Sequence, residues 1–220
     1  MALTKVIGAG LGTLTEDQVL GGATPTLTIG DAGAEDAKIV FDGNAQDFHI
    51  GLDDSTDSLT IGLGSALGTT THMKFDSTGC VTKPLQPAFH ATPSSTQTNL
   101  SNATTIAFGT ERFDQNGDFA SNTFTAPVTG KYQINVSIGL LDTDSAAAFI
   151  GLALISSNKA YYILVDPDYG QDNAYGELAL HQLIDMDAND TVYVNFLQNG
   201  GTAQTDVHED HSNFSGYLVA

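Results

Sequence analysis

The 220-residue chain contains no tryptophan, a single cysteine, six prolines and only seven basic side chains. Cys80 has no second cysteine to pair with, which excludes an intrachain disulfide and the disulfide-dense class of small secreted scaffolds. No hydrophobic run approaches the roughly 18 residues of a membrane-spanning helix, and no apolar stretch typical of a signal peptide follows Met1. We therefore expect neither membrane insertion nor a secretory signal.

The shortage of positive charge leaves a strongly acidic chain. It has 26 acidic and seven basic side chains, for a formal net charge of −19, and every basic residue lies at or before Lys159. Such a surface repels nucleic acid and anionic membranes, so we expect neither as a partner. Two interpretations of the acids stay open. They form a solubility surface, or some of them hold divalent cations such as calcium; no other cofactor is predicted.

Alternation of apolar and polar residues is the main structural signal. From Tyr132 to Leu140 every second residue is apolar, which is typical of a strand with one buried face. The 23 glycines and the 41% hydrophobic content favour an all-β chain with one sizeable core and an appendage. Further strands are expected at 104–108, 147–156, 160–165, 175–184, 191–197 and 214–219, a number that suits a two-sheet jelly roll.

The first 84 residues differ from the rest. Residues 1–25 hold a glycine-rich apolar stretch and a possible capping box at Thr15–Gln18, which predicts one or two helical turns in a docking segment. Residues 26–84 repeat short strand-like units that end at Gly or Asp, at 26–30, 38–43, 47–51, 58–62 and 72–76. Because each unit buries little by itself, we expect stabilisation by association, as a β-stalk intertwined from three chains. A small independent β-domain is the alternative.

Three segments in order resemble the globular head of the complement C1q and tumour necrosis factor superfamily. They are an aromatic segment with glycine, Phe113 to Phe119; the sequence FTAPVTGKY from Phe124 to Tyr132; and the closing FSGYLV from Phe214. The resemblance covers residues 85–220 and implies a jelly-roll head. It also implies that three heads pack about an axis and that the loops at the outer end vary and bind. One of the adjacent Tyr161 and Tyr162 must point away from the core, and an outward tyrosine is suited to a subunit interface.

The segment from Ile39 to Asp54, followed by Leu59–Gly62, resembles connecting regions of tailed-phage fibres and spikes. It implies a virion location for a non-enzymatic structural protein, a homotrimer. Residues 1–25 would dock to other virion proteins, residues 26–84 would form the stalk, and residues 85–220 would display the head. The display would serve adhesion to a host-surface glycan or protein, or decoration of the capsid. The alternative is a non-viral, complement-like extracellular binding module; an enzyme that degrades a surface polymer is a third class, to which no motif points.

One loop carries the predicted binding residues. Asp166, Asp168, Tyr169 and Asp172 lie in a polar, acidic connection between two expected strands. This loop could contact a receptor or supply oxygen ligands to calcium. Asp114–Asp118 has the acid–amide alternation of a calcium loop but lacks its glycine and terminal glutamate, so we interpret it as a turn. His208–His211 crowds four possible ligands without the spacing of a metal site. No catalytic residue is predicted.

Overall fold

The computed structural model describes residue 17 and residues 19–220. The predicted docking segment therefore lies largely outside the described residues, and residues 19–36 contain no helix or strand. The contacts between residues divide the chain into two compact units. The N-terminal unit comprises most of the residues up to Val81, and the C-terminal unit contains Thr82–Ala220. We call the second unit the head.

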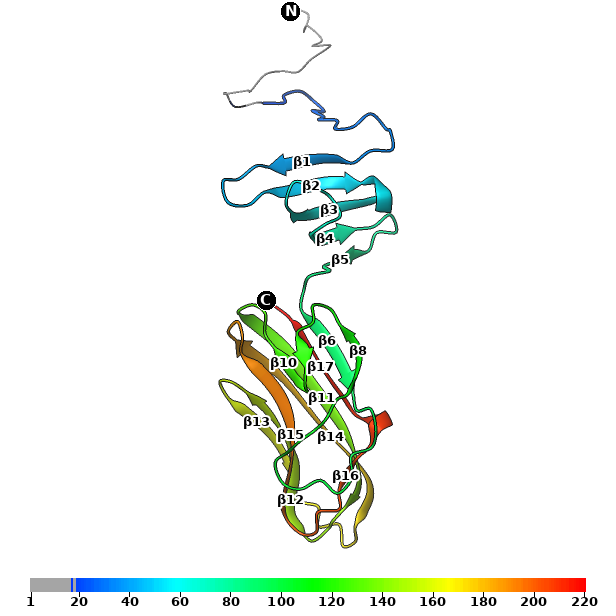
Figure 1. Ribbon diagram of the computed structural model, residues 1–220, viewed down its shortest axis with the longest axis vertical. Helices are drawn as coiled ribbons and strands as arrows, with labels where there is room; N and C mark the ends of the chain where they lie inside the picture. Colours follow the sequence, from blue (N-terminus) through cyan, green and yellow to red (C-terminus); the bar gives the residue numbers. More distant parts are fainter. Residues whose placement is uncertain (1–16, 18) are drawn as a thin grey trace, which may run out of the picture. The chain divides into compact units, whose positions relative to one another are not determined.

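The N-terminal unit is a five-stranded sheet in the order β1-β2-β3-β4-β5 (Figure 1). A single 3-10 turn, η1 (Asp54–Thr56), separates β2 from β3. The pairings β1–β2 and β2–β3 are both antiparallel. The strands are β1 (Ala37–Phe41), β2 (Phe48–Asp53), β3 (Ser58–Leu63), β4 (Thr71–Phe75) and β5 (Val81–Thr82).

Four of the five predicted strand-like units are strands in the structure. The prediction of a strand at the first one, residues 26–30, is wrong. Residues 26–30 are irregular and exposed. Alternation within such a short stretch does not make a strand unless a neighbour accepts its backbone hydrogen bonds, and β1 pairs only with β2. Whether this sheet associates with further chains, as in the expected stalk, or stands as an independent domain stays a prediction.

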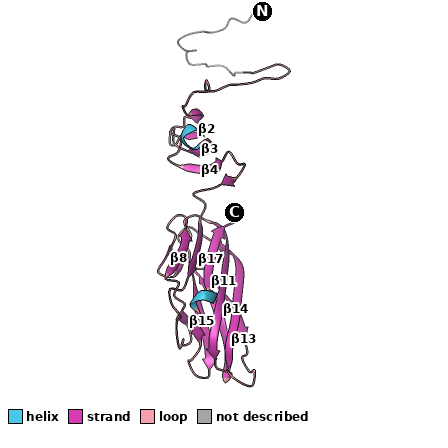
Figure 2. Ribbon diagram, turned by 90° about the vertical axis from the view of Figure 1, so that its right-hand side faces the viewer, coloured by secondary structure: helices cyan, strands magenta, loops and turns pink. Residues whose placement is uncertain are grey.

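The head is a jelly roll of two facing sheets, as expected (Figure 2). One sheet has the order β13-β12-β15-β10-β9, with β7 beside β15; the other has the order β14-β11-β17-β6-β8, with β16 beside β11. Only η2 (Glu209–His211) is helical in the head. The head strands are β6 (Ala88–Thr92), β7 (Thr104–Thr105), β8 (Thr110–Asp114), β9 (Phe119–Ala120), β10 (Thr123–Thr125), β11 (Gly130–Thr143), β12 (Ala147–Ser156), β13 (Ala160–Val165), β14 (Asn173–Met186), β15 (Thr191–Gly200), β16 (Asp206–Val207) and β17 (Asn213–Leu218).

The alternating residues of β11 form the centre of the core. Tyr132, Ile134, Val136, Ile138 and Leu140 are all at most 1% exposed. They meet the apolar positions of β12 and β15 from the opposite sheet, and the predicted alternation is confirmed there too. On β13, Tyr161 packs against the core while Tyr162 is exposed, so the expectation for this pair holds.

The chain turns sharply before β11, and glycine is required in this corner for space rather than for backbone conformation. Gly130 does not adopt a positive φ. A Cβ atom at this position would lie 2.7 Å from the carbonyl oxygen of Ala220 and 2.7 Å from Leu218 Cδ1. Close approach of the C-terminal strand therefore requires glycine here. The Tyr132 hydroxyl donates a 2.7 Å hydrogen bond to the Val128 carbonyl and fixes the corner.

Candidate functional site

Three loops meet at the end of the head away from the C-terminus (Figure 1). They are the β11–β12 turn at 144–146, the β13–β14 loop at 166–172 and the β15–β16 loop at 201–205. We call this cluster the loop end. The predicted binding residues Asp166, Asp168, Tyr169 and Asp172 all lie in the middle loop.

Asp172 ties the three loops together. Its Oδ1 accepts hydrogen bonds from the backbone N–H and the hydroxyl of Ser145, each at 3.0 Å. Its Oδ2 accepts one from the Gln204 side-chain amide at 3.0 Å. The carboxylate is thus engaged with its own chain, and its main role in this structure is to position the loops.

Asp144 makes a second tie. Its carboxylate accepts a hydrogen bond from the Ala146 backbone at 2.8 Å and another from the Thr202 backbone. The chain reaches Thr202 through Gly201, whose φ of 67° is easily adopted only by glycine. A Cβ at this position would also lie 2.9 Å from Asp144 Oδ2. Both conditions favour glycine at this point of the loop end.

Both ties depend on ionised carboxylates. The backbone donor of Ser145 holds the pKa of Asp172 below its ordinary value, and that of Thr202 does the same for Asp144. A depressed folded-state pKa means that these groups stabilise the loops above the ordinary pKa of about 3.8, and that this contribution is lost as pH falls through the lower folded value. The loop end should therefore stay ordered at neutral and mildly acidic pH.

Asp172→Ala should loosen the loop end without unfolding the head. The change removes three exposed hydrogen bonds, which we expect to lower the free energy of unfolding only slightly. Amide hydrogen exchange should accelerate at 144–146 and 202–205. Asp168→Ala serves as the control, because its exposed side chain takes no part in these ties. Equal exchange rates in the two variants would contradict the anchoring role of Asp172.

The exposed groups of the loop end are tyrosines and acids. Tyr169 is 57% exposed and Tyr175 is 74% exposed, and both line a shallow hollow of about 430 Å³. A neighbouring hollow of about 360 Å³ is lined by Asp142, Asp172 and Asp206. Sequence analysis missed Tyr175, Asp142 and Asp206, because they lie in or beside three strands that only the fold brings together.

The geometry of the described side chains does not support a metal site. Among residue 17 and residues 19–220, no group of three or more His, Cys, Asp or Glu side chains is placed to hold a metal ion. His208 and His211 have ring centroids 4.5 Å apart, and His208 Nδ1 accepts a hydrogen bond from the Asp210 backbone. Asp114 accepts hydrogen bonds from the backbones of Asp118 and Phe119, which agrees with a turn. Calcium stays a prediction of the sequence.

Comparison with known proteins identifies the head. The family model of the C1q domain matches residues 88–219, which is more than half of the chain. The chain belongs to the C1q domain family. The C1q domain contains all three segments on which the sequence resemblance depended.

Solved structures resemble the chain only distantly. The globular domain of zebrafish complement 1qA is 16% identical with a TM-score of 0.44, and covers 61% of this chain and 98% of its own. Murine APRIL at pH 8.0 is 8% identical with a TM-score of 0.46, and covers 61% and 99%. No curated protein matches the chain. No helix among the described residues is long and apolar enough to cross a bilayer.

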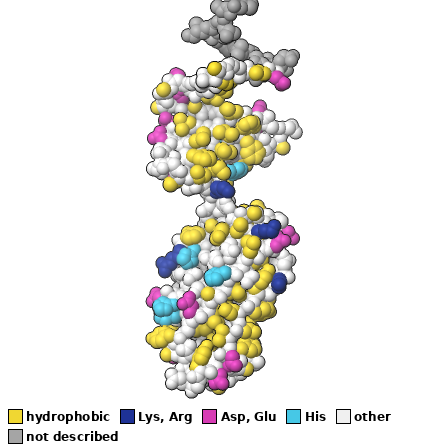
Figure 3. Space-filling model, turned by 180° about the vertical axis from the view of Figure 1, so that it is seen from behind, with side chains coloured by type: hydrophobic (Ala, Val, Ile, Leu, Met, Phe, Trp, Pro, Cys, Tyr) yellow, Lys and Arg dark blue, Asp and Glu magenta, His cyan; other side chains and the backbone are white. Residues whose placement is uncertain are grey.

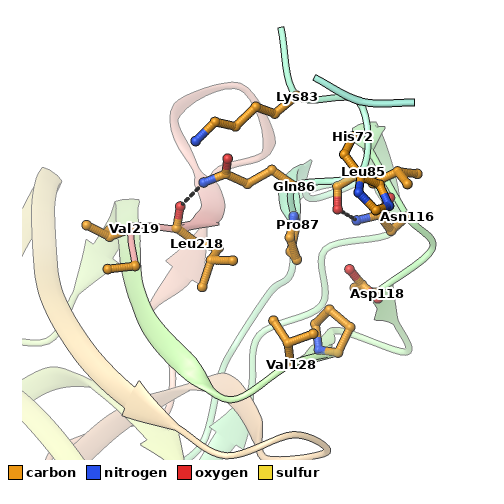
Figure 4. A pocket seen from close by; sticks show the side chains of 12 residues that line it. His72, Lys83, Leu85, Gln86, Pro87, Asn116, Asp118, Val128, Leu218 and Val219 are labelled. Atoms are coloured by element: carbon orange, nitrogen blue, oxygen red, sulfur yellow. Dashed lines mark hydrogen bonds between the residues drawn. The ribbon is translucent and has the colours of Figure 1, made fainter. Parts of the chain in front are cut away.

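A third hollow lies at the opposite end of the C1q domain, where β6 begins and β17 ends (Figure 4). Its lining includes Pro87, Val128 and Leu218. The Gln86 side-chain amide donates a 2.7 Å hydrogen bond to the Leu218 carbonyl at its edge. Asp118 also faces the hollow, and its Oδ2 is buried without a hydrogen-bond partner.

Because of Asp118, the free energy of unfolding should rise on mild acidification. Burial, and secondarily the Asp114 charge, raise the pKa of Asp118. The folded protein therefore binds this proton more tightly than the unfolded chain, and the ionised group costs stability above its raised pKa. Asp118→Asn should increase the free energy of unfolding at pH 7, with the gain vanishing as pH falls through that pKa. Asp114→Asn should instead destabilise at pH 7, because it weakens two accepted hydrogen bonds; urea titrations at several pH values test both.

Proposed function

We propose that the protein is a homotrimeric binding protein that displays the loop end of its C1q domain. The observation that carries the proposal is the loop end itself, a surface fixed by the ties of Asp144 and Asp172 that presents Tyr169 and Tyr175 to solvent. Tyrosine offers a large contact area at low entropic cost, and loops held in place before binding lose little entropy on binding. Three copies would add avidity to weak individual contacts.

The outer face of the second sheet supports the trimer. Leu183, Gln133 and Tyr217 face one another across β14, β11 and β17, and the next row holds His181, Asn135 and Ser215. Leu183 is 54% exposed and Tyr217 is 49% exposed. Neither row contains Asp, Glu, Lys or Arg, although the chain as a whole has a net charge of −19. A depletion of charge around exposed large side chains is typical of the centre of an interface.

Native mass spectrometry tests the trimer. We expect a mass of three times 23.0 kDa for the unaltered chain, and a monomer for Leu183→Glu, because three buried carboxylates would face an apolar contact. Tyr169→Glu, with a charge at the loop end, should stay trimeric. A chelator should leave the mass unchanged if calcium plays no part, and dissociate the trimer if calcium holds it together. A monomeric unaltered chain would refute the trimer.

Binding is tested with an array of bacterial surface glycans. The unaltered trimer should bind at least one glycan class, and Tyr169→Ala together with Tyr175→Ala should reduce that binding at least tenfold with no change in mass. Tyr162→Ala, on the outer side of β13, is the matched control. Binding that survives loss of both tyrosines would exclude the loop end as the site.

We further propose that the trimer is a structural protein of a tailed-phage virion, a fibre, spike or capsid decoration. The support is the resemblance of Ile39–Asp54 to phage connecting regions, and residues 1–25 would dock to other virion proteins. The C1q family membership equally favours an extracellular complement-like module. An antibody to the head distinguishes them. It should label tailed particles from cultures that express the chain, whereas free secreted protein with unlabelled particles would favour the module.

A further inference from the structure

The N-terminal sheet is apolar on its outer face and polar on its covered face. Along β2, Phe48, Ile50 and Leu52 are exposed, whereas the alternate residues His49, Gly51 and Asp53 are buried. β3 repeats the inversion, with Ser58 and Thr60 buried and Leu59 exposed. A sheet that stood alone in water would bury the apolar side instead.

Register aligns the apolar residues in three rows across β1, β2 and β3. Ile39, Ile50 and Ile61 form the central row. The flanking rows are Ala37, Leu52 and Leu59 on one side and Phe41, Phe48 and Leu63 on the other. We call these nine residues the apolar face. Hydrophobic side chains gather on one side of this unit in Figure 3, and none of the nine is charged.

The opposite face of β2 and β3 is already covered by the chain itself. His49 is fully buried, and its Nδ1 lies 2.8 Å from the Gly64 carbonyl oxygen at the start of the loop that follows β3. A Cβ on Gly62 would lie 2.3 Å from the Thr70 carbonyl, so this loop lies directly on the sheet. Asp53 is engaged by the Ser55 hydroxyl at 2.6 Å. Among the described residues, the apolar side of β2 and β3 is therefore the more exposed one.

We propose that the apolar face packs against the apolar faces of two further copies of this chain, about the axis of the trimer. The proposal rests on the trimer proposed for the C1q domain. None of the nine residues of the apolar face is charged, so three such faces meet without burying a charge among these residues. The sheets of three chains would then enclose a common apolar core.

The size of the apolar face favours packing against copies that trimeric heads already hold together. It is less suited to binding a separate partner. Six of its side chains are between 37% and 55% exposed. Together they present on the order of 500 Å² of apolar surface, whereas a stable interface buries roughly 800 Å² per partner. The face is thus small for an independent association. It suffices where trimeric heads already hold the copies at an effective concentration in the millimolar range.

Cross-linking between engineered cysteines tests the packing in the full-length chain. Cys80→Ser removes the one native thiol, and Ile50→Cys then places a thiol in the central row. Lys38→Cys is the matched control, because it neighbours Ile39 on β1 and points to the opposite side of the sheet. Leu59→Cys provides a second position on the apolar face. A bismaleimide with a short spacer is the probe, and each variant is also weighed by native mass spectrometry.

We expect Ile50→Cys and Leu59→Cys to give covalently linked chains at least fivefold more than Lys38→Cys does. A trimeric mass without this preference would overturn the packing of the apolar faces and leave the trimeric C1q domain intact. If the thiols at positions 50 and 59 neither cross-link nor react with the maleimide, another segment or partner covers the apolar face. That outcome also overturns the proposal. A monomeric mass would overturn both proposals.

Discussion

Phe89→Ala should lower the free energy of unfolding of the head by about 3–5 kcal/mol, the largest single effect that we expect. The Phe89 ring stacks on Phe119 and Phe124 at centroid distances of 4.9 and 4.8 Å and meets the edge of Phe214 at 5.0 Å. Its loss leaves a cavity at the centre of this cluster and removes three ring contacts at once. A loss of this size is a large share of the 5–15 kcal/mol typical of a domain.

Phe113→Ala is the matched control for this experiment. Phe113 lies on β8, 52% exposed, so the same chemical change should cost less than about 1 kcal/mol. Urea titration at one fixed protein concentration measures both variants, since association would otherwise shift the apparent stability. Similar losses in the two variants would contradict the cluster as the centre of the core.

Gly151→Ala should separate β13 from β12. The strands pair with Gly151 opposite Leu164. A Cβ on Gly151 would lie 2.3 Å from the Ile163 carbonyl oxygen and 2.5 Å from Leu164 Cδ2. Because a backbone oxygen cannot rotate away as a side chain can, the edge strand has to move. We expect a loss of about 2–3 kcal/mol.

Hydrogen exchange locates this effect. The amides of β13 should exchange at least tenfold faster, while those of the β11–β14 pair should change little. Gly176→Ala is the control, because its Cβ would meet only the Asn173 side-chain amide, at 3.1 Å, and that group can turn aside. Unchanged exchange in β13 of the Gly151 variant would show that the strands accommodate the methyl group.

Local patterning explains how much of the head could be predicted. The alternation in β11 indicates a strand with one buried face, and this prediction is confirmed. The three aromatic segments also contain Phe119, Phe124 and Phe214, which the structure buries to at most 4% exposure. The predicted loop at 166–172 is also a loop. Its neighbours could not be predicted, because Asp172 meets Ser145 and Gln204 from distant turns.

The alternation of apolar and polar residues gave a wrong or incomplete prediction in two places, for a common reason. Residues 26–30 alternate like the strands after them but have no partner strand. Alternation also identified Ile50 and Leu59 as apolar positions without revealing that their side of the sheet is open. Which side is covered depends on the 64–70 loop lying against His49, a tertiary contact.

The sequence by itself determined the all-β class, the C1q resemblance, the acidic surface and the strand positions of the head, since these follow from composition and from the period of two. Tertiary structure decided which carboxylates tie loops, which tyrosines face solvent, and which side of the N-terminal sheet remains apolar and exposed. The physical reason is that periodicity assigns a residue to a face of its own strand. Only the packing of segments remote in sequence determines what, if anything, covers that face.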